Sequence, residues 1–111
     1  MKNEPFLIRF LDTSLAQANL DARSLAESVK DVGPNLSAEV VRESPETLDF
    51  GASVAIILGT ASVTAIANGI ARWLARNAGA KIEIRQDGAV LATNLNSTDA
   101  AKIAQAFSQK R

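Results

Sequence analysis

The chain has 111 residues, of which 47% are hydrophobic and 22% are charged, and its 12 basic residues balance its 12 acidic ones. This composition is typical of one folded domain and provides no general electrostatic field for nucleic acid or an anionic membrane surface. Neither cysteine nor histidine occurs, which excludes disulfides, thiolate nucleophiles and most zinc sites and general bases. We therefore expect a single domain over residues 1–111, with no cofactor, metal or catalytic residue.

The N-terminal residues bear on localisation. The apolar stretch that follows Pro5 is short and is interrupted by Arg9, so it does not resemble a secretory signal peptide. We expect a cytoplasmic protein.

The first third of the chain predicts a strand, a helix and a second strand. Residues 6–11 alternate between an apolar side and a mixed side, as a half-buried strand requires. Apolar residues recur at steps of three and four over residues 22–32, which predicts a helix that Gly33 and Pro34 terminate. Residues 36–41 predict the second strand.

An uncharged segment over residues 50–71 follows. Its second half has helical spacing and predicts a long helix that Thr60 caps and residues 77–79 end. Residues 53–58 form a short apolar run, which fits a buried strand or a helical turn that kinks at Gly59. We favour the helix.

After this helix the pattern changes to a strict alternation, which predicts a β-hairpin over residues 81–95. Asp87-Gly88 suits a two-residue type I′ turn. Counting outward from that turn sets Ile84 opposite Leu91 and Ile82 opposite Thr93.

A final helix is predicted after the hairpin. Asn96 or Ser97 is its expected N-cap, and Asp99 lies in its first turn. Its buried stripe is expected to contain Ala100, Ile103, Ala104 and Phe107. The order strand, helix, strand, long helix, hairpin, helix predicts an α+β fold, with helices packed over one or both faces of a sheet.

The uncharged segment over residues 50–71 also permits a different class of protein. It is long enough to span a bilayer and repeats small residues at the four-residue spacing of membrane helix pairs. However, it is rich in Ala, Ser, Thr, Asn and Gly, and Asn68 is costly in lipid. We favour a soluble domain, with a membrane-inserted component as the alternative. A minimal hydrolase that uses Ser or Asp without histidine is a second alternative.

Several motifs of the chain occur together in a known family. They are Asp49-Phe50-Gly51, Ile57-Leu58-Gly59-Thr60, the long-helix segment 65–74, Lys81-Ile82-Glu83-Ile84 with Asp87-Gly88, and the tail 96–106, with residues 10–14 matching as well. In these stretches the chain resembles the effector-associated constant component domain of bacterial conflict systems. The resemblance covers most of the chain, and its motifs are structural rather than catalytic.

The resemblance implies a non-enzymatic adaptor or regulator in a bacterial defence system. Domains of this family are usually encoded beside caspase-like or trypsin-like effectors and regulatory NTPases, so the implied partner is a protein of one of these classes. A homo-oligomer is compatible with this role. The family provides no established binding residues that could be carried over to this chain.

The residues themselves suggest one contact surface, at the corner between the long helix and the hairpin. Arg72, Arg76, Lys81 and Arg85 gather in sequence around this corner. Trp73 lies beside the buried stripe and is predicted to belong to the core, although tryptophan is also common in binding hot spots. The hairpin can supply an edge strand for an extended peptide. We therefore expect Trp73, Arg76, Lys81 and Arg85 to be the protein-binding residues.

Overall fold

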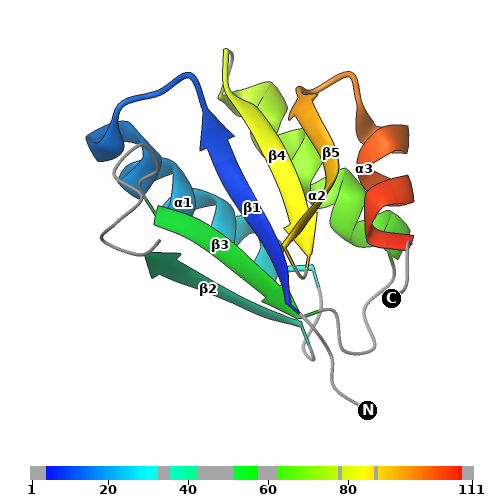
Figure 1. Ribbon diagram of the computed structural model, residues 1–111. Helices are drawn as coiled ribbons and strands as arrows, with labels where there is room; N and C mark the ends of the chain where they lie inside the picture. Colours follow the sequence, from blue (N-terminus) through cyan, green and yellow to red (C-terminus); the bar gives the residue numbers. More distant parts are fainter. Residues whose placement is uncertain are drawn as a thin grey trace.

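The structure is a computed structural model that describes residues 5–32, 36–42, 52–57, 63–77, 79–86 and 88–108. In these ranges the chain forms an α+β fold of five strands and three helices (Figure 1). The elements are, in chain order, β1 (Phe6–Leu11), α1 (Leu15–Lys30), β2 (Ser37–Arg42), β3 (Ala52–Ile57), α2 (Val63–Arg76), β4 (Lys81–Gln86), β5 (Ala89–Leu95) and α3 (Ala100–Ser108). This order confirms the predicted α+β class.

The strands form one sheet in the order β2-β3-β1-β4-β5, and all neighbours are antiparallel. Therefore β1 and β2, which α1 connects, run parallel with β3 between them. In the same way β3 and β4, which α2 connects, run parallel with β1 between them. The first six elements follow the β-α-β-β-α-β order of ferredoxin-like domains, to which β5 and α3 are added.

The described helices cover one face of this sheet (Figure 1). Two aromatic contacts place α2 and α3 on the same side of β1. The ring of Phe10 lies 5.7 Å from that of Trp73 on α2, and the ring of Phe6 lies 4.7 Å from that of Phe107 on α3. Because α1 contacts both β3 and α2, it belongs to the same layer.

The core lies between the sheet and the helices because the apolar residues of each strand alternate. In β1 and β4 every second side chain is buried, while the side chains between them are only half-buried. The fully buried side chains on the strands include Ile8, Val54, Ile56, Ile82 and Ile84.

The structure contradicts the helix that we favoured for residues 53–58, because residues 53–57 lie in β3. Leu58 lies outside the described residues. Strand β3 pairs with β1 on one side and with β2 on the other. Val54 and Ile56 are fully buried, as expected for an inner strand. The apolar run is too short to have a decisive period, so tertiary pairing determines its structure.

The uncharged segment 50–71 thus contains β3 and the first part of α2, instead of helical structure in both of its halves. Within the described residues, none of the helices is long and apolar enough to cross a membrane.

Helix α1 begins at Leu15, well before the predicted start at Ala22. Ser14 is its N-cap, and its hydroxyl accepts a hydrogen bond from the backbone N–H of Gln17 at 3.1 Å. The start was missed because Gln17 and Asn19 interrupt the apolar period of the first turns.

The predicted cap Thr60 of the long helix lies outside the described residues, and α2 is described from Val63.

The hairpin has the predicted two-residue connection but not the predicted register. Next to the turn, Gln86 pairs with Ala89 and Arg85 with Val90, and Gly88 has a φ of +80° that suits a type I′ turn. Further out, two irregularities shift the pairing. Ile84 therefore pairs with Ala92 instead of Leu91, and Ile82 with Leu95 instead of Thr93. The predicted register is wrong because it assumes a hairpin without bulges.

The N-cap of α3 also differs from the prediction of Asn96 or Ser97. The carbonyl of Asp99 accepts the first helical hydrogen bond, from the N–H of Ile103 at 2.9 Å, so Asp99 occupies the cap position. Asn96 instead shapes the preceding turn, where its side-chain oxygen accepts from the N–H of Thr98 at 2.9 Å.

Trp73 is expected to be one of the most important residues for stability. Its side chain is fully buried, and its Nε1 donates a hydrogen bond to Ser24 Oγ at 2.8 Å. Trp73→Ala should lower the free energy of unfolding by about 3–5 kcal/mol, as measured by chemical denaturation. Val90→Ala, on the half-exposed edge of β5, is the control and should change it by less than about 0.5 kcal/mol. Similar losses in the two variants would contradict this packing.

Candidate functional site

The candidate site begins with a close approach of two helices. Gly69 of α2 faces Val32, just after α1, and a Cβ atom at position 69 would lie only 2.9 Å from Val32 Cγ2. Side chains do not tolerate that separation, so glycine is needed for the helices to come this near. Ala65, one turn before Gly69, is also small and leaves space above the contact.

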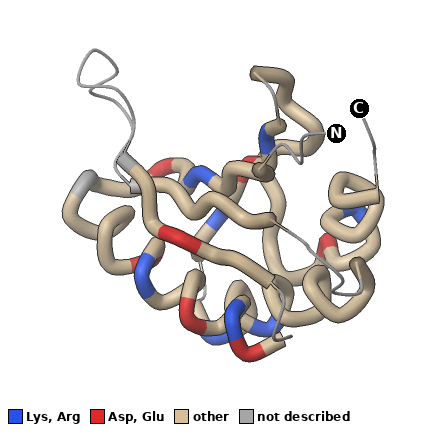
Figure 2. Tube along the Cα trace, turned by 90° about the horizontal axis from the view of Figure 1, so that it is seen from below, with Lys and Arg blue, Asp and Glu red and all other residues tan. Residues whose placement is uncertain are grey.

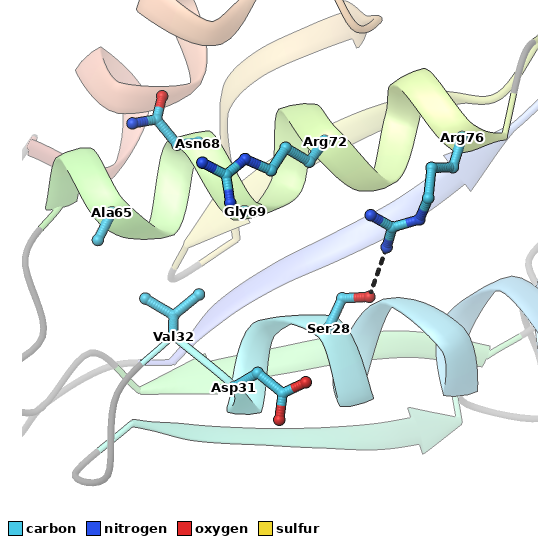
Figure 3. A pocket seen from close by; sticks show the side chains of 8 residues that line it. All are labelled: Ser28, Asp31, Val32, Ala65, Asn68, Gly69, Arg72 and Arg76. Atoms are coloured by element: carbon cyan, nitrogen blue, oxygen red, sulfur yellow. Dashed lines mark hydrogen bonds between the residues drawn. The ribbon is translucent and has the colours of Figure 1, made fainter.

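A groove of about 420 Å³ lies over this contact, between α1 and α2 (Figure 3). Both helices contribute polar side chains to its walls. The lining residues are Ser28, Asp31, Val32, Ala65, Asn68, Gly69, Arg72 and Arg76. We call this cavity the α1/α2 groove.

Asn68, Arg72 and Arg76 line one side of the groove because they are spaced one helical turn apart on α2. Arg76 reaches across to α1, where its Nη2 donates a hydrogen bond to Ser28 Oγ at 3.1 Å (Figure 3). Arg72 is exposed, and no hydrogen bond or ion pair joins it to another described residue. Within the described part of the chain, the donors of its guanidinium therefore have no partner.

The charges of the α1/α2 groove are unequal. Arg72 and Arg76 contribute two positive charges, while Asp31 is the single acidic residue among the described lining residues. A guanidinium presents its N–H groups in a planar fork that matches a carboxylate or a phosphate. The groove is consequently suited to an anionic group that carries two acceptor oxygens.

The structure does not bring the four predicted contact residues onto one surface. Trp73 is fully buried, which confirms its predicted core position and removes it from the surface. Arg76 lines the α1/α2 groove. Lys81 lines a separate cavity of about 290 Å³ at the end of β1, and Arg85 lies near the other end of β4, beside Gly88.

Arg85 also differs from the groove arginines in its partners, because it belongs to a charged cluster on the sheet face opposite the helices. Its Nη1 lies 3.4 Å from Glu83 Oε2, and its Nη2 donates to the Gly88 carbonyl at 3.3 Å. Glu83 further accepts a hydrogen bond from Thr93 Oγ1 at 3.0 Å and lies 4.0 Å from Arg9 Nη1. Arg85 therefore already has a carboxylate partner, whereas Arg72 has no partner among the described residues.

Along the described Cα trace, basic and acidic residues are interspersed (Figure 2). The described residues contain no group of three or more His, Cys, Asp or Glu side chains that could hold a metal ion.

Sequence reasoning noticed Arg72 but not its role, and it missed the contribution of α1. The spacing of Asn68, Arg72 and Arg76 was the available signal, since it places three polar side chains along one side of α2. Ser28 and Asp31 are distant in sequence, and only the packing of α1 against α2 brings them to the groove.

Comparisons of the chain with protein-family models, with curated proteins and with solved structures found no match.

The contact between Gly69 and Val32 can be tested by a double-mutant cycle. Gly69→Ala should lower the free energy of unfolding by about 1–3 kcal/mol, because the added methyl group overpacks the helix crossing. In a Val32→Ala background the same substitution should raise it by about 0.5–1 kcal/mol, because alanine is the better helix former. Denaturant unfolding of the four proteins measures this coupling. Equal effects in both backgrounds would show that the helices do not meet at Gly69.

Proposed function

We propose that this chain is a cytosolic, non-enzymatic protein-interaction component of a bacterial conflict system, and that it acts as an adaptor or regulator of an effector. The resemblance to the effector-associated constant component family motivates the biological setting. The α1/α2 groove carries the molecular part of the proposal, because it offers an arginine pair that a single carboxylate does not neutralise.

The chemistry of the groove favours binding over hydrolysis. A serine nucleophile needs a neighbouring base that removes its proton. In the groove the Ser28 hydroxyl accepts a hydrogen bond from Arg76, whose guanidinium stays protonated and cannot act as that base. Asp31 also lines the groove, but no hydrogen bond joins its carboxylate to Ser28. Arginine is instead frequent at the centres of protein interfaces, where its fork binds carboxylates.

The partner that fits the groove is a protein with an exposed acidic segment. One of its carboxylates would engage Arg72, whose donors have no partner among the described residues, and a neighbouring group would compete with Ser28 for Arg76. The resemblance directs the search to a caspase-like or trypsin-like effector or a regulatory NTPase. Lys81 and Arg85 remain candidate contacts of the alternative in which the partner binds at the hairpin.

Charge reversal tests the groove as the contact surface. Arg72→Glu and Arg76→Glu should each weaken binding of the partner protein by more than about tenfold in a calorimetric titration, because each replaces attraction by repulsion. Both residues are exposed, so the melting temperature should change little.

Two further variants make this experiment decisive. Arg23→Glu removes an exposed arginine of α1 that does not line the groove, and it should leave affinity almost unchanged. Arg85→Glu tests the hairpin surface. If Arg85→Glu weakens binding while the two groove variants do not, the partner binds at the sheet face and the groove is not the interface.

The biological setting is tested by the genes that adjoin the one encoding this chain. A neighbouring gene for a caspase-like or trypsin-like protease or a regulatory NTPase is the expected result, and the encoded protein should then copurify with this chain from the native host. Neighbours that encode only metabolic enzymes would contradict the assignment to a conflict system.

A further inference from the structure

The two edge strands of the sheet differ in how well they are protected against pairing with another strand. On β5 the pairing with β4 is shifted twice, and Asn94 adopts a left-handed conformation with φ of +60°. Such irregularities discourage a further strand from adding to an edge. On β2 the pairing with β3 is continuous from Ser37 to Arg42, without a shift. The β2 edge therefore has the regular geometry that accepts another strand.

The β2 edge also exposes an apolar side chain on the helix side of the sheet. Ala38 and Val40 lie on that side, since they pair with the buried residues Ile56 and Val54. Ala38 is only 1% exposed, whereas Val40 is 41% exposed. An apolar partner beside the edge would remove the exposed part of Val40 from water.

We propose that a second copy of this chain pairs with β2 in antiparallel orientation, about a two-fold axis that passes beside Val40. The axis is perpendicular to the sheet, so the helices of both copies lie on the same side. The two sheets then become one continuous sheet with an isologous interface, in which each copy uses the same surface.

The side chains of β2 select this register from the alternatives. Side chains alternate between the two faces of a strand, and directly opposed residues share a face of the sheet. The two-fold axis must therefore set one residue opposite its own copy, so it passes beside a residue and not between two consecutive residues. Axes at Glu39 and at Val40 give the greatest overlap of the two strands. The first sets Glu39 opposite its own copy, and opposed like charges destabilise a sheet. The second sets Val40 opposite Val40 and Glu39 opposite Val41.

This assembly does not depend on the proposed function, and it has a consequence for that function. The α1/α2 groove lies on the side of α1 that faces α2, whereas β2 is the outer strand of the sheet (Figure 1). Pairing at β2 therefore leaves the grooves of both copies open. Two linked grooves would increase the apparent affinity for a partner that is itself dimeric.

Chemical crosslinking tests which edge pairs. Since the chain contains no cysteine, Val40→Cys and Val90→Cys each introduce a unique thiol at an exposed position of β2 or β5. With a short bismaleimide, the Val40→Cys protein should give a covalent dimer in high yield and the Val90→Cys protein should stay monomeric. Equal yields, or a dimer from Val90→Cys alone, would overturn the proposal.

Sedimentation equilibrium of the protein tests the register. Val40→Lys sets two lysines opposite each other and should raise the dimer dissociation constant by at least about tenfold. Glu39→Lys places the same side chain on the neighbouring residue, opposite Val41, and should change the constant by less than about threefold. Circular dichroism confirms that both variants fold. A wild-type monomer at all concentrations, or a larger effect of Glu39→Lys, would overturn the proposal.

Discussion

The position of α2 in the fold depends on Trp73, which is in contact with both the sheet and α1. Its ring packs against Phe10 at the centre of the sheet, and its Nε1 donates to Ser24 on α1. An indole that is fully buried needs such a partner for its N–H, so the hydrogen bond fixes the rotation of α2 as well as its distance from α1. The neighbouring residues Arg72 and Arg76 are consequently held at the groove between the two helices.

The α1/α2 groove results from this arrangement together with the absence of a side chain at Gly69. The helices approach closely where glycine meets Val32, and the arginines project from the adjacent turns of α2. Rigid helices thus hold two guanidiniums in a defined relation to each other. Because the helices are already ordered, arginines on them lose less conformational entropy on binding than arginines on a loop would lose.

Much of the fold could be predicted from the sequence, because the apolar residues of β1 and β4 alternate and those of α2 and α3 recur at helical spacing. Trp73 was likewise placed in the core by its spacing from the buried stripe. Residues 53–58 could not be assigned correctly, since a short apolar run fits either a strand or a helix until its neighbours are known. The shifted pairing of β5 was also not predictable, because nothing in the neighbouring sequence indicates the left-handed conformation of Asn94.

The candidate site was predictable only in part, because its residues come from parts of the chain that are distant in sequence. Arg76 was identified from the sequence, but it was grouped with Lys81 and Arg85 by proximity along the chain. In the structure Arg85 lies across the sheet from α2 and is engaged with Glu83. The groove instead places Arg76 near the C-terminal end of α1, where it donates a hydrogen bond to Ser28, 48 residues earlier in the sequence. Asp31, the C-cap of α1, lines the same groove. Only tertiary packing brings these residues together.

An NMR titration shows directly whether a partner protein binds in the α1/α2 groove. In a ¹⁵N-labelled sample the side-chain Nε–Hε resonances of Arg72 and Arg76 report contact at the groove itself. Addition of the partner protein should shift both resonances, together with the backbone amides of Asn68 and Gly69. Shifts confined to the Arg85 side chain and the amides of β4 and β5, with the groove unchanged, would contradict it.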